Sequence, residues 1–223
     1  MRIAKRLLFA KESSVALGFV PGKKKGQHYE LAMFALNKAK KVNLLLKGQT
    51  EKHFEFTIVS HLQSSPRLRK NLITQIGVDE VEKMTKASLF GFSHWPDVSI
   101  GNSGTAIEIK VVQGGPGMRD ILGQAIAYRM HYRFVILVVI DQTPECKIVE
   151  LCQDKTSQEY RLLSGLADEL NIFSIVGPLG QSKNVVFSGR RRVMREPGPS
   201  AAKHEIAPKP SPDVKGGSTP TGL

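Results

Sequence analysis

The chain has 223 residues, of which 41% are apolar and 23% are charged, and this composition is ordinary for one globular domain with a small appendage. Its longest uninterrupted apolar run, residues 134–140, is far too short to span a bilayer, so we expect no membrane segment. The 32 Lys and Arg exceed the 20 Asp and Glu, which gives a formal charge of +12. Such an excess serves either solubility alone or a polyanionic partner, most often nucleic acid.

The N-terminal residues 1–48 are predicted to form a helical segment packed on the core. Residues 1–20 lack the long apolar stretch and the small-residue cleavage site of a secretory signal. They are interpreted as a short amphipathic segment, with a transit peptide as the alternative. A basic turn over residues 21–26, interpreted as a solvated loop, leads to a helix that an apolar stripe predicts over residues 28–47.

A second helix is predicted over residues 51–63, with Thr50 as its N-cap. Glu51 and Glu55 lie one turn apart, and both point toward the apolar stripe of this helix. Acids in that position need a partner, because burying an unpaired carboxylate is costly. The simplest alternative for Glu51 is that an acid there favours the helix N-terminus.

The basic region that follows, residues 66–86, is predicted to hold one helix near 68–75 and another near 79–86. The apolar residues 87–92 are predicted to form the strand that precedes the central hairpin of the chain. Trp95 is the only tryptophan. It can stack on a base, although a lone tryptophan is more often a packing residue.

The segment Trp95–Val112 alternates apolar and charged residues across its second half. In an extended chain Glu108 and Lys110 leave one face, and the branched apolar residues beside them anchor the opposite face. The turn-forming residues 101–104 separate this strand from the one that holds Asp97. A hairpin is therefore predicted to bring Asp97 and Glu108 together at one end of a sheet.

Two carboxylates beside a lysine need a physical reason, because like charges so close to each other repel. A divalent cation removes the conflict, and Mg²⁺ is commonly held by one or two carboxylates together with water and phosphate. Lys110 is then a second positive group beside the phosphate or the attacking water. The alternative is that Asp97 caps a turn, while Glu108 and Lys110 form a surface ion pair on a half-exposed strand.

After a glycine-rich turn over residues 113–117, a helix is predicted over residues 120–132, and Gln124 and Tyr128 share its apolar face. The apolar run at 134–140 is typical of a strand buried on both faces. A helix between two strands implies a crossover connection and a mixed central sheet.

The C-terminal third is predicted to contain a helix over residues 158–170 and a peripheral strand over residues 172–176. Residues 191–223 are predicted to begin with a basic cluster and to continue as a disordered tail rich in Pro, Gly and Ser. From Glu196 onward three lysines balance three acids, so the net charge belongs to the rest of the chain.

The chain has two cysteines, Cys146 and Cys152, which form no C-x-x-C pair and have no histidine at ligand spacing. A zinc site is therefore not expected. Isolated cysteines fit a reducing compartment, and we expect a cytoplasmic protein.

The central hairpin resembles the motif of a known enzyme superfamily. Pro96-Asp97, a spacer and Glu108-x-Lys110 between apolar residues resemble the PD-(D/E)XK motif of the nuclease superfamily of that name. The downstream segment GQAIAY, which holds Gln124, resembles the Gln-x-x-x-Tyr signature of one branch of that superfamily. It follows the strand that holds Glu108 and Lys110, where the family places that signature.

The resemblance covers roughly residues 51–140 and implies an α/β fold of the restriction-endonuclease-like type over residues 49–190. Such a fold has a mixed central sheet, here of about four or five strands, flanked by helices. The implied activity is that of a Mg²⁺-dependent endonuclease acting on nucleic acid, chiefly DNA, with Mn²⁺ able to replace Mg²⁺. A homodimer is compatible with this activity, because cutting two strands often requires two copies.

The resemblance also assigns roles to residues of this chain. The implied metal ligands are Asp97, Glu108 and the backbone carbonyl of Ile109. Lys110 would position the attacking water or stabilise charge on the phosphate. Gln124 would hold the site or the substrate.

A glutamate on the first core helix often reaches the metal or its water shell in this superfamily. Glu51 is the better match for that role, and Glu55 is the reserve. Two other functions stay open from the sequence: a non-catalytic nucleic-acid-binding protein with a nuclease-like fold, and a basic scaffold or ribosome-associated factor. In the last case Asp97 and Glu108 would lie far apart.

Overall fold

The computed structural model describes four stretches of the chain, residues 18–44, 49–75, 83–178 and 184–189. These stretches belong to one compact unit, which ends at Arg191. The predictions for residues 1–17, for most of the helix near 79–86 and for the tail from 191 onward lie outside the described residues. No helix among the described residues is long and apolar enough to cross a membrane.

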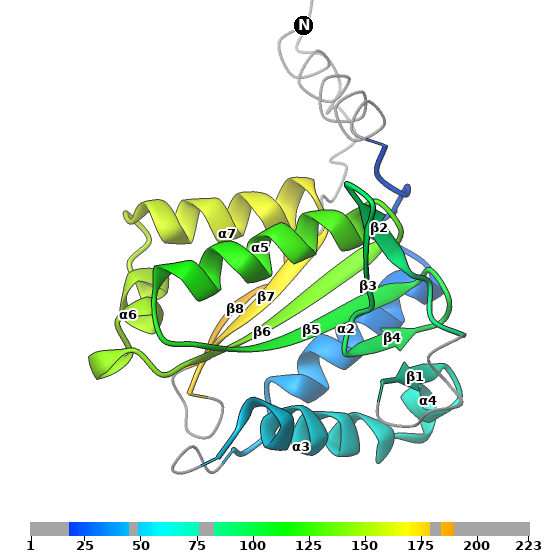
Figure 1. Cartoon of the computed structure of the whole chain (residues 1–223), viewed down its shortest axis with the longest axis horizontal. Coiled ribbons are helices and arrows are strands. Elements are labelled where there is room, and N and C mark those ends of the chain that lie inside the picture. The colour runs from blue at the N-terminus through cyan, green and yellow to red at the C-terminus, as the bar shows by residue number, and fades with distance from the viewer. Residues whose placement is uncertain (1–17, 45–48, 76–82, 179–183, 190–223) are drawn as a thin grey trace, which may run out of the picture. The chain divides into compact units, whose positions relative to one another are not determined.

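A six-stranded mixed sheet lies at the centre of the fold (Figure 1). Its strands are β1 (Leu72–Thr74), β4 (Val98–Ile100), β5 (Thr105–Val112), β6 (Phe134–Asp141), β7 (Ile172–Gly177) and β8 (Val185–Phe187), in that spatial order. The central pairs β5–β6 and β6–β7 are parallel. The flanking pairs β1–β4, β4–β5 and β7–β8 are antiparallel, so the sheet is mixed as predicted.

Helices cover both faces of this sheet. One face carries α2 (Gln27–Ala39) and α3 (Glu51–Gln63), and the other carries α5 (Gly115–Arg129) and α7 (Gln158–Glu169) (Figure 1). The remaining elements are short: α4 (Pro66–Arg69), η2 (Pro144–Cys146), α6 (Lys147–Gln153) and a separate hairpin of β2 (Ala87–Leu89) and β3 (Phe92–His94).

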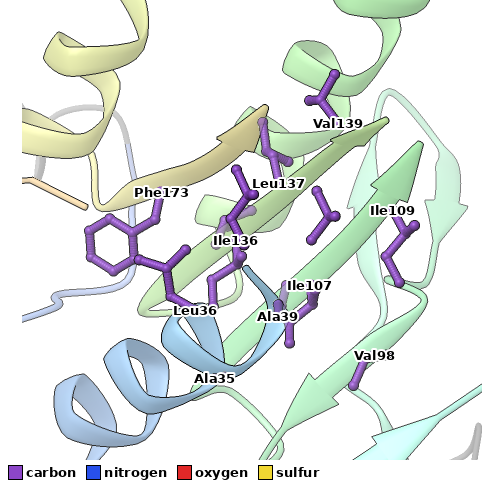
Figure 2. Close-up of a cluster of buried hydrophobic side chains, with 14 of the residues drawn as sticks. Ala35, Leu36, Ala39, Val98, Ile107, Ile109, Ile136, Leu137, Val139 and Phe173 are labelled. Atoms are coloured by element: carbon purple, nitrogen blue, oxygen red, sulfur yellow. The ribbon is translucent and has the colours of Figure 1, made fainter. Parts of the chain in front are cut away.

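The hydrophobic core is built around β6, because all eight of its residues are buried. This confirms the strand predicted at 134–140 to be buried on both faces. On one side, the small residues Ala35 and Ala39 let α2 approach the sheet closely at Ile107 and Ile136 (Figure 2). The central strands of the sheet are therefore packed against helices on both faces.

The helix predicted near residues 68–75 is wrong in its second half. Helix α4 ends at Arg69, and Leu72–Thr74 forms β1 instead. All three residues of β1 are buried and pair antiparallel with Val98–Ile100. The tertiary pairing outweighs the weak helical pattern of this basic region, because it buries Leu and Ile side chains that a solvated helix would leave exposed.

The strand predicted over residues 87–92 is a hairpin outside the main sheet. Its two strands, β2 and β3, are joined by Phe90 and Gly91, whose φ angles are 52° and 83°. Two positive φ values in a two-residue loop define the tight turn that suits a twisted hairpin. The strand beside β4 in the main sheet is therefore β1, not the segment that follows residue 86.

Two predicted helices have different bounds in the structure. The helix predicted over 120–132 begins at Gly115 and ends at Arg129, because Pro116 suits the first turn of a helix. The glycine-rich segment before it is thus partly helical. The helix predicted over 28–47 begins at Gln27 and ends at Ala39, so the prediction is wrong for residues 40–44, which are described and not helical, while residues 45–48 lie outside the described part.

The sheet has one strand more than expected. β8 pairs with β7, so the strand predicted to be peripheral is internal, and the edge is occupied by Val185–Phe187. The basic turn before α2 is also less solvated than predicted. Lys24 Nζ donates to the carbonyls of Ala167 and Asp168, each at 2.8 Å, which satisfies carbonyls at the C-terminus of α7.

Candidate active site

Asp97 and Glu108 face each other across β4 and β5. Asp97 immediately precedes β4, and Val98 pairs with Ile107, so the antiparallel register continues to Asp97 opposite Glu108. One carboxylate oxygen of Asp97, Oδ2, accepts a hydrogen bond of 2.7 Å from the backbone N–H of Ile109. The structure therefore brings the two motif acids together, with Asp97 one residue outside the strand predicted to hold it.

Glu108 is buried, with only 6% of its surface exposed. The Tyr128 hydroxyl on α5 donates to its Oε2 at 3.0 Å and also lies 3.1 Å from the backbone carbonyl of Trp95. Lys110 forms an ion pair with Glu51, not with Glu108. The alternative of a surface Glu108–Lys110 pair on a half-exposed strand is thus wrong.

Burial raises the pKa of both motif acids. The pKa of Asp97 rises to about 7, chiefly because burial removes water, and the negative charge of Glu55 adds to the effect. The pKa of Glu108 rises to about 8, again through burial first and then through the charge of Asp97, while the Tyr128 hydrogen bond opposes the rise. Two acids in this state share protons near neutral pH unless a cation is present.

Lys110 is held by an acid from a different part of the chain. Its Nζ lies 3.1 Å from Glu51 Oε1, and the other oxygen of Glu51 accepts a 3.0 Å hydrogen bond from the backbone N–H of Val111. The hydrogen bond to Glu51 is the chief reason that the pKa of Lys110 is raised. Glu51 therefore fixes both the ammonium and the end of the strand that carries it.

Glu55 faces the site one turn further along α3. Its own pKa is raised by burial, although the charge of Lys52 opposes this. The charges of Glu55 and Glu51 both raise the pKa of Asp97, and that of Glu55 has the larger effect. Glu51 pairs with Lys110, whereas Glu55 acts on Asp97 through its charge.

The predicted roles of Gln124 and Ile109 are not tested by these contacts. Gln124 lies on α5 one turn before Tyr128, and its buried Oε1 has no hydrogen-bond partner among the described residues. Ile109 is a buried core residue whose backbone N–H serves Asp97. A substrate contact for Gln124 and a metal contact for the Ile109 carbonyl stay predictions.

Gln75 is a supporting residue that the sequence reasoning missed. Its side-chain Nε2 donates to the carbonyls of Trp95 at 2.8 Å and Pro96 at 3.1 Å, so it fixes the backbone that leads into Asp97. Gln75 ends the helix predicted near residues 68–75, and nothing in the sequence pattern indicates such a contact. Tyr128, in contrast, had a signal, because the Gln-x-x-x-Tyr segment singles it out.

A cleft of about 550 Å³ opens beside Glu51, where β5 and β6 end. Its polar wall includes Thr50, Glu51, Gln113 and Gln142, and Val111 and the glycine and proline residues at the start of α5 also line it. The cleft adjoins the Glu51–Lys110 pair and does not include the two motif acids. It provides room for a polar group beside Glu51, the partner of Lys110.

The acid pair fits a divalent cation of the Mg²⁺ type. Among the described residues, no group of three or more His, Cys, Asp or Glu gathers as a metal site, so such an ion would rely on two carboxylates with backbone oxygen and water. That donor set is ordinary for Mg²⁺. Burial is the chief cause of the raised pKa values of Asp97 and Glu108, and a bound cation would favour their charged forms.

Comparison with known proteins gives no relative for this chain. No protein-family model matches it, and neither a curated protein nor a solved structure does. The function of the site is therefore inferred from its own residues and their contacts.

Proposed function

We propose that this protein is a metal-dependent nuclease of the restriction-endonuclease-like type, which hydrolyses phosphodiester bonds in nucleic acid, chiefly DNA. The observation that carries the proposal is the meeting of four groups from three separate elements. Asp97 and Glu108 face each other beside β4 and β5, and Lys110 of β5 is held by Glu51 of α3. A structural role alone does not require two adjacent buried acids with raised pKa values.

The architecture supports the proposal. The mixed sheet has helices on both faces, and the strand with Glu108 and Lys110 is followed by helix α5, which returns Tyr128 to Glu108. This is the order of elements that the PD-(D/E)XK resemblance implies. The formal charge of +12 supports a polyanionic substrate, because cationic surfaces attract phosphate backbones.

Asp97, Glu108 and the backbone carbonyl of Ile109 would hold the Mg²⁺, with Mn²⁺ as a substitute. When bound, such an ion polarises the scissile phosphate and lowers the pKa of a coordinated water. Lys110 presents its ammonium to the phosphate or to the attacking water, and Glu51 keeps that ammonium in one place. Tyr128 orients Glu108 through its hydroxyl.

Cleavage assays test the proposal directly. The wild type is incubated with supercoiled plasmid and with single-stranded DNA in Mg²⁺, beside Asp97→Ala and Lys110→Ala. Glu150→Gln and Lys155→Ala are matched controls, because they remove an acid and a lysine that are exposed and far along the chain from the site. We expect cleavage by the wild type and both controls and a loss of roughly a hundredfold or more in the two site variants. Full activity in the site variants would overturn the assignment.

Calorimetric titration with Mg²⁺ separates the nuclease from a non-catalytic nucleic-acid-binding protein of the same fold. The nuclease must bind Mg²⁺ in the wild type and lose that binding in Asp97→Asn. A nucleic-acid-binding protein that does not cut has no need of the ion. The same preparation, examined by sedimentation with and without duplex DNA, tests whether a homodimer forms on the substrate.

A further inference from the structure

The β2–β3 hairpin presents bulky aromatic side chains to solvent. Phe90 at its tip is 91% exposed, and Phe92 on β3 is 70% exposed. Trp95 follows directly and is also exposed. A single exposed aromatic residue needs no explanation, but three within six residues on one small hairpin do.

The tip of the hairpin is also strained. Phe90 has a φ of 52°, in the left-handed region that asparagine and glycine adopt readily and that a bulky residue adopts at a cost. Its neighbour Gly91 has a φ of 83°, and a side chain added there would meet no atom within 4 Å. The tip therefore projects into solvent and holds a phenylalanine where local backbone preference favours asparagine. Strain of this kind persists where the exposed side chain has a use.

The hairpin is fixed to the acid pair at its base. The Trp95 carbonyl is held by Gln75 Nε2 at 2.8 Å and lies 3.1 Å from the Tyr128 hydroxyl, which also donates to Glu108. Only Pro96 separates Trp95 from Asp97. A group bound on these aromatic rings is thus held at a set position relative to the acids.

The basic residues of the hairpin segment indicate which kind of partner its aromatic rings would bind. Residues 83–96 contain Lys83, Lys86 and His94 but no Asp or Glu. The ammonium of Lys86 lies 5.1 Å from the centre of the Trp95 ring, so a cation and an aromatic face are presented together. Exposed aromatic rings beside a cation suit nucleobases that lie next to phosphates.

From these observations we infer that the hairpin, called here the aromatic hairpin (residues 86–95), stacks unpaired bases and directs the nuclease to single-stranded or branched nucleic acid. The inference rests on the proposed function, because it names the substrate class of the same site. Phe90 and Phe92 stack on bases that are not paired, and Lys86 contacts the adjoining phosphate. A fully paired duplex offers its base faces only at its ends, so it gains little from these rings.

The test uses the full chain in EDTA, so that binding is measured without cleavage. A branched oligonucleotide carries 2-aminopurine in its unpaired arm, and a blunt duplex of the same length carries it in a base pair. Stacking on an aromatic ring quenches the fluorescence of the unpaired probe. Phe90→Asn is the main variant, because asparagine suits the backbone at the tip and the substitution removes only an exposed ring. Phe56→Asn, which removes another exposed phenylalanine on α3, is the matched control.

We expect Phe90→Asn to weaken binding of the branched probe roughly tenfold and to abolish most of its quenching, since stacking of one base is lost. Binding of the blunt duplex should stay within about twofold for both variants, and the control should bind both probes like the wild type. The melting temperature of Phe90→Asn should equal or exceed that of the wild type, because the substitution relieves strain.

Three results would overturn the inference. The wild type and Phe90→Asn could bind the branched probe with equal affinity, or Phe90→Asn could lose the same amount of affinity for both probes. In the third case, sedimentation would show that Phe90→Asn alters self-association and nothing else. The two proposals fail separately. If quenching depends on Phe90 but the protein cleaves no nucleic acid, base stacking by the aromatic hairpin is supported and the nuclease proposal is wrong. If the protein cleaves branched and blunt substrates and Phe90→Asn changes neither rate, the nuclease proposal is supported and base stacking by the aromatic hairpin is wrong.

Discussion

Lys110 and Glu51 lie 59 residues apart in the chain, and their side chains meet at 3.1 Å. The strand supplies the lysine, and the first turn of α3 supplies the acid. Because the second oxygen of Glu51 binds the N–H of Val111, the pair is fixed at two points. Glu51 is therefore a positioning residue for Lys110, and the ion pair and the Val111 contact distinguish it from Glu55, although the charges of both glutamates act on Asp97.

Replacing Glu51 by glutamine should lower the single-turnover cleavage rate about ten- to hundredfold, because the ammonium of Lys110 loses its fixed partner. The variant should also lower the pKa of Lys110, since the Glu51 hydrogen bond and charge raise it in the wild type. The alkaline limb of the pH–rate profile then moves to lower pH. A rate loss without any change in that limb would contradict the positioning role.

Replacing Glu55 by glutamine should have a different effect. Removing its charge should lower the pKa of Asp97, so Mg²⁺ binding should fall less steeply between about pH 8 and about pH 6 than it does in the wild type. Because the same negative charge also attracts the cation, the affinity at about pH 8 should fall by roughly a few-fold. Calorimetry at the two pH values measures both changes. Loss of Mg²⁺ binding at both pH values would instead make Glu55 a metal ligand, in the role predicted first for Glu51.

Replacing Tyr128 by phenylalanine should weaken the site through Glu108. The hydroxyl lowers the pKa of Glu108 by donating to its charged form, so its loss should raise that pKa further. We expect the acid limb of Mg²⁺-dependent cleavage to move to higher pH and the protein to lose about 1 kcal/mol of stability. Tyr132→Phe is the matched control, because that buried hydroxyl donates to the carbonyl of Thr85 and to no acid of the site. The same pH dependence of cleavage in Tyr128→Phe and Tyr132→Phe would contradict the proposed effect of the Tyr128 hydroxyl on Glu108.

The two motif acids should make the metal-free protein less stable as pH rises. Their folded-state pKa values, about 7 and about 8, exceed the ordinary values of 3.8 and 4.5, so the folded state binds protons more tightly than the unfolded state does. The protonated pair thus favours folding at low pH, and this contribution is lost as pH rises from about 4 to about 8.

The double variant Asp97→Asn with Glu108→Gln should lack this loss. At pH about 8 in EDTA it should melt several degrees above the wild type, whereas near pH 4 the two should differ little. Added Mg²⁺ should raise the melting temperature of the wild type and not that of the double variant. A wild-type melting temperature that exceeds that of the variant at about pH 8 without metal would contradict the destabilisation caused by burying these acids in their charged forms.

Asp141 is a buried acid with a structural role, and it provides a contrast. Its carboxylate accepts hydrogen bonds from the backbone N–H groups of Thr143 and Val149, each at 2.9 Å, and from the Thr143 hydroxyl. Asp141→Ala should destabilise the protein by about 1–3 kcal/mol, since it leaves the buried N–H of Val149 unpaired. Cleavage per folded molecule should stay unchanged, which a chemical denaturation curve and an activity assay on the same sample will show.

The sequence alone determined those features of this protein that depend on neighbouring residues in the chain. The alternation of apolar and charged residues shows which residues of the strand Thr105–Val112 share a face, and the apolar run after α5 identifies the central strand. Both signals are periodic and arise from neighbours in the chain. They also placed Asp97 near Glu108, because only a short turn separates them.

The tertiary structure decided what depends on residues distant in sequence. The partner of Lys110 is Glu51, and the strand beside β4 is Leu72–Thr74, because chain segments far apart pack together there. The raised pKa values of the acids likewise depend on burial by elements on both faces of the sheet. No periodicity encodes such contacts, since they follow from how the whole core excludes water.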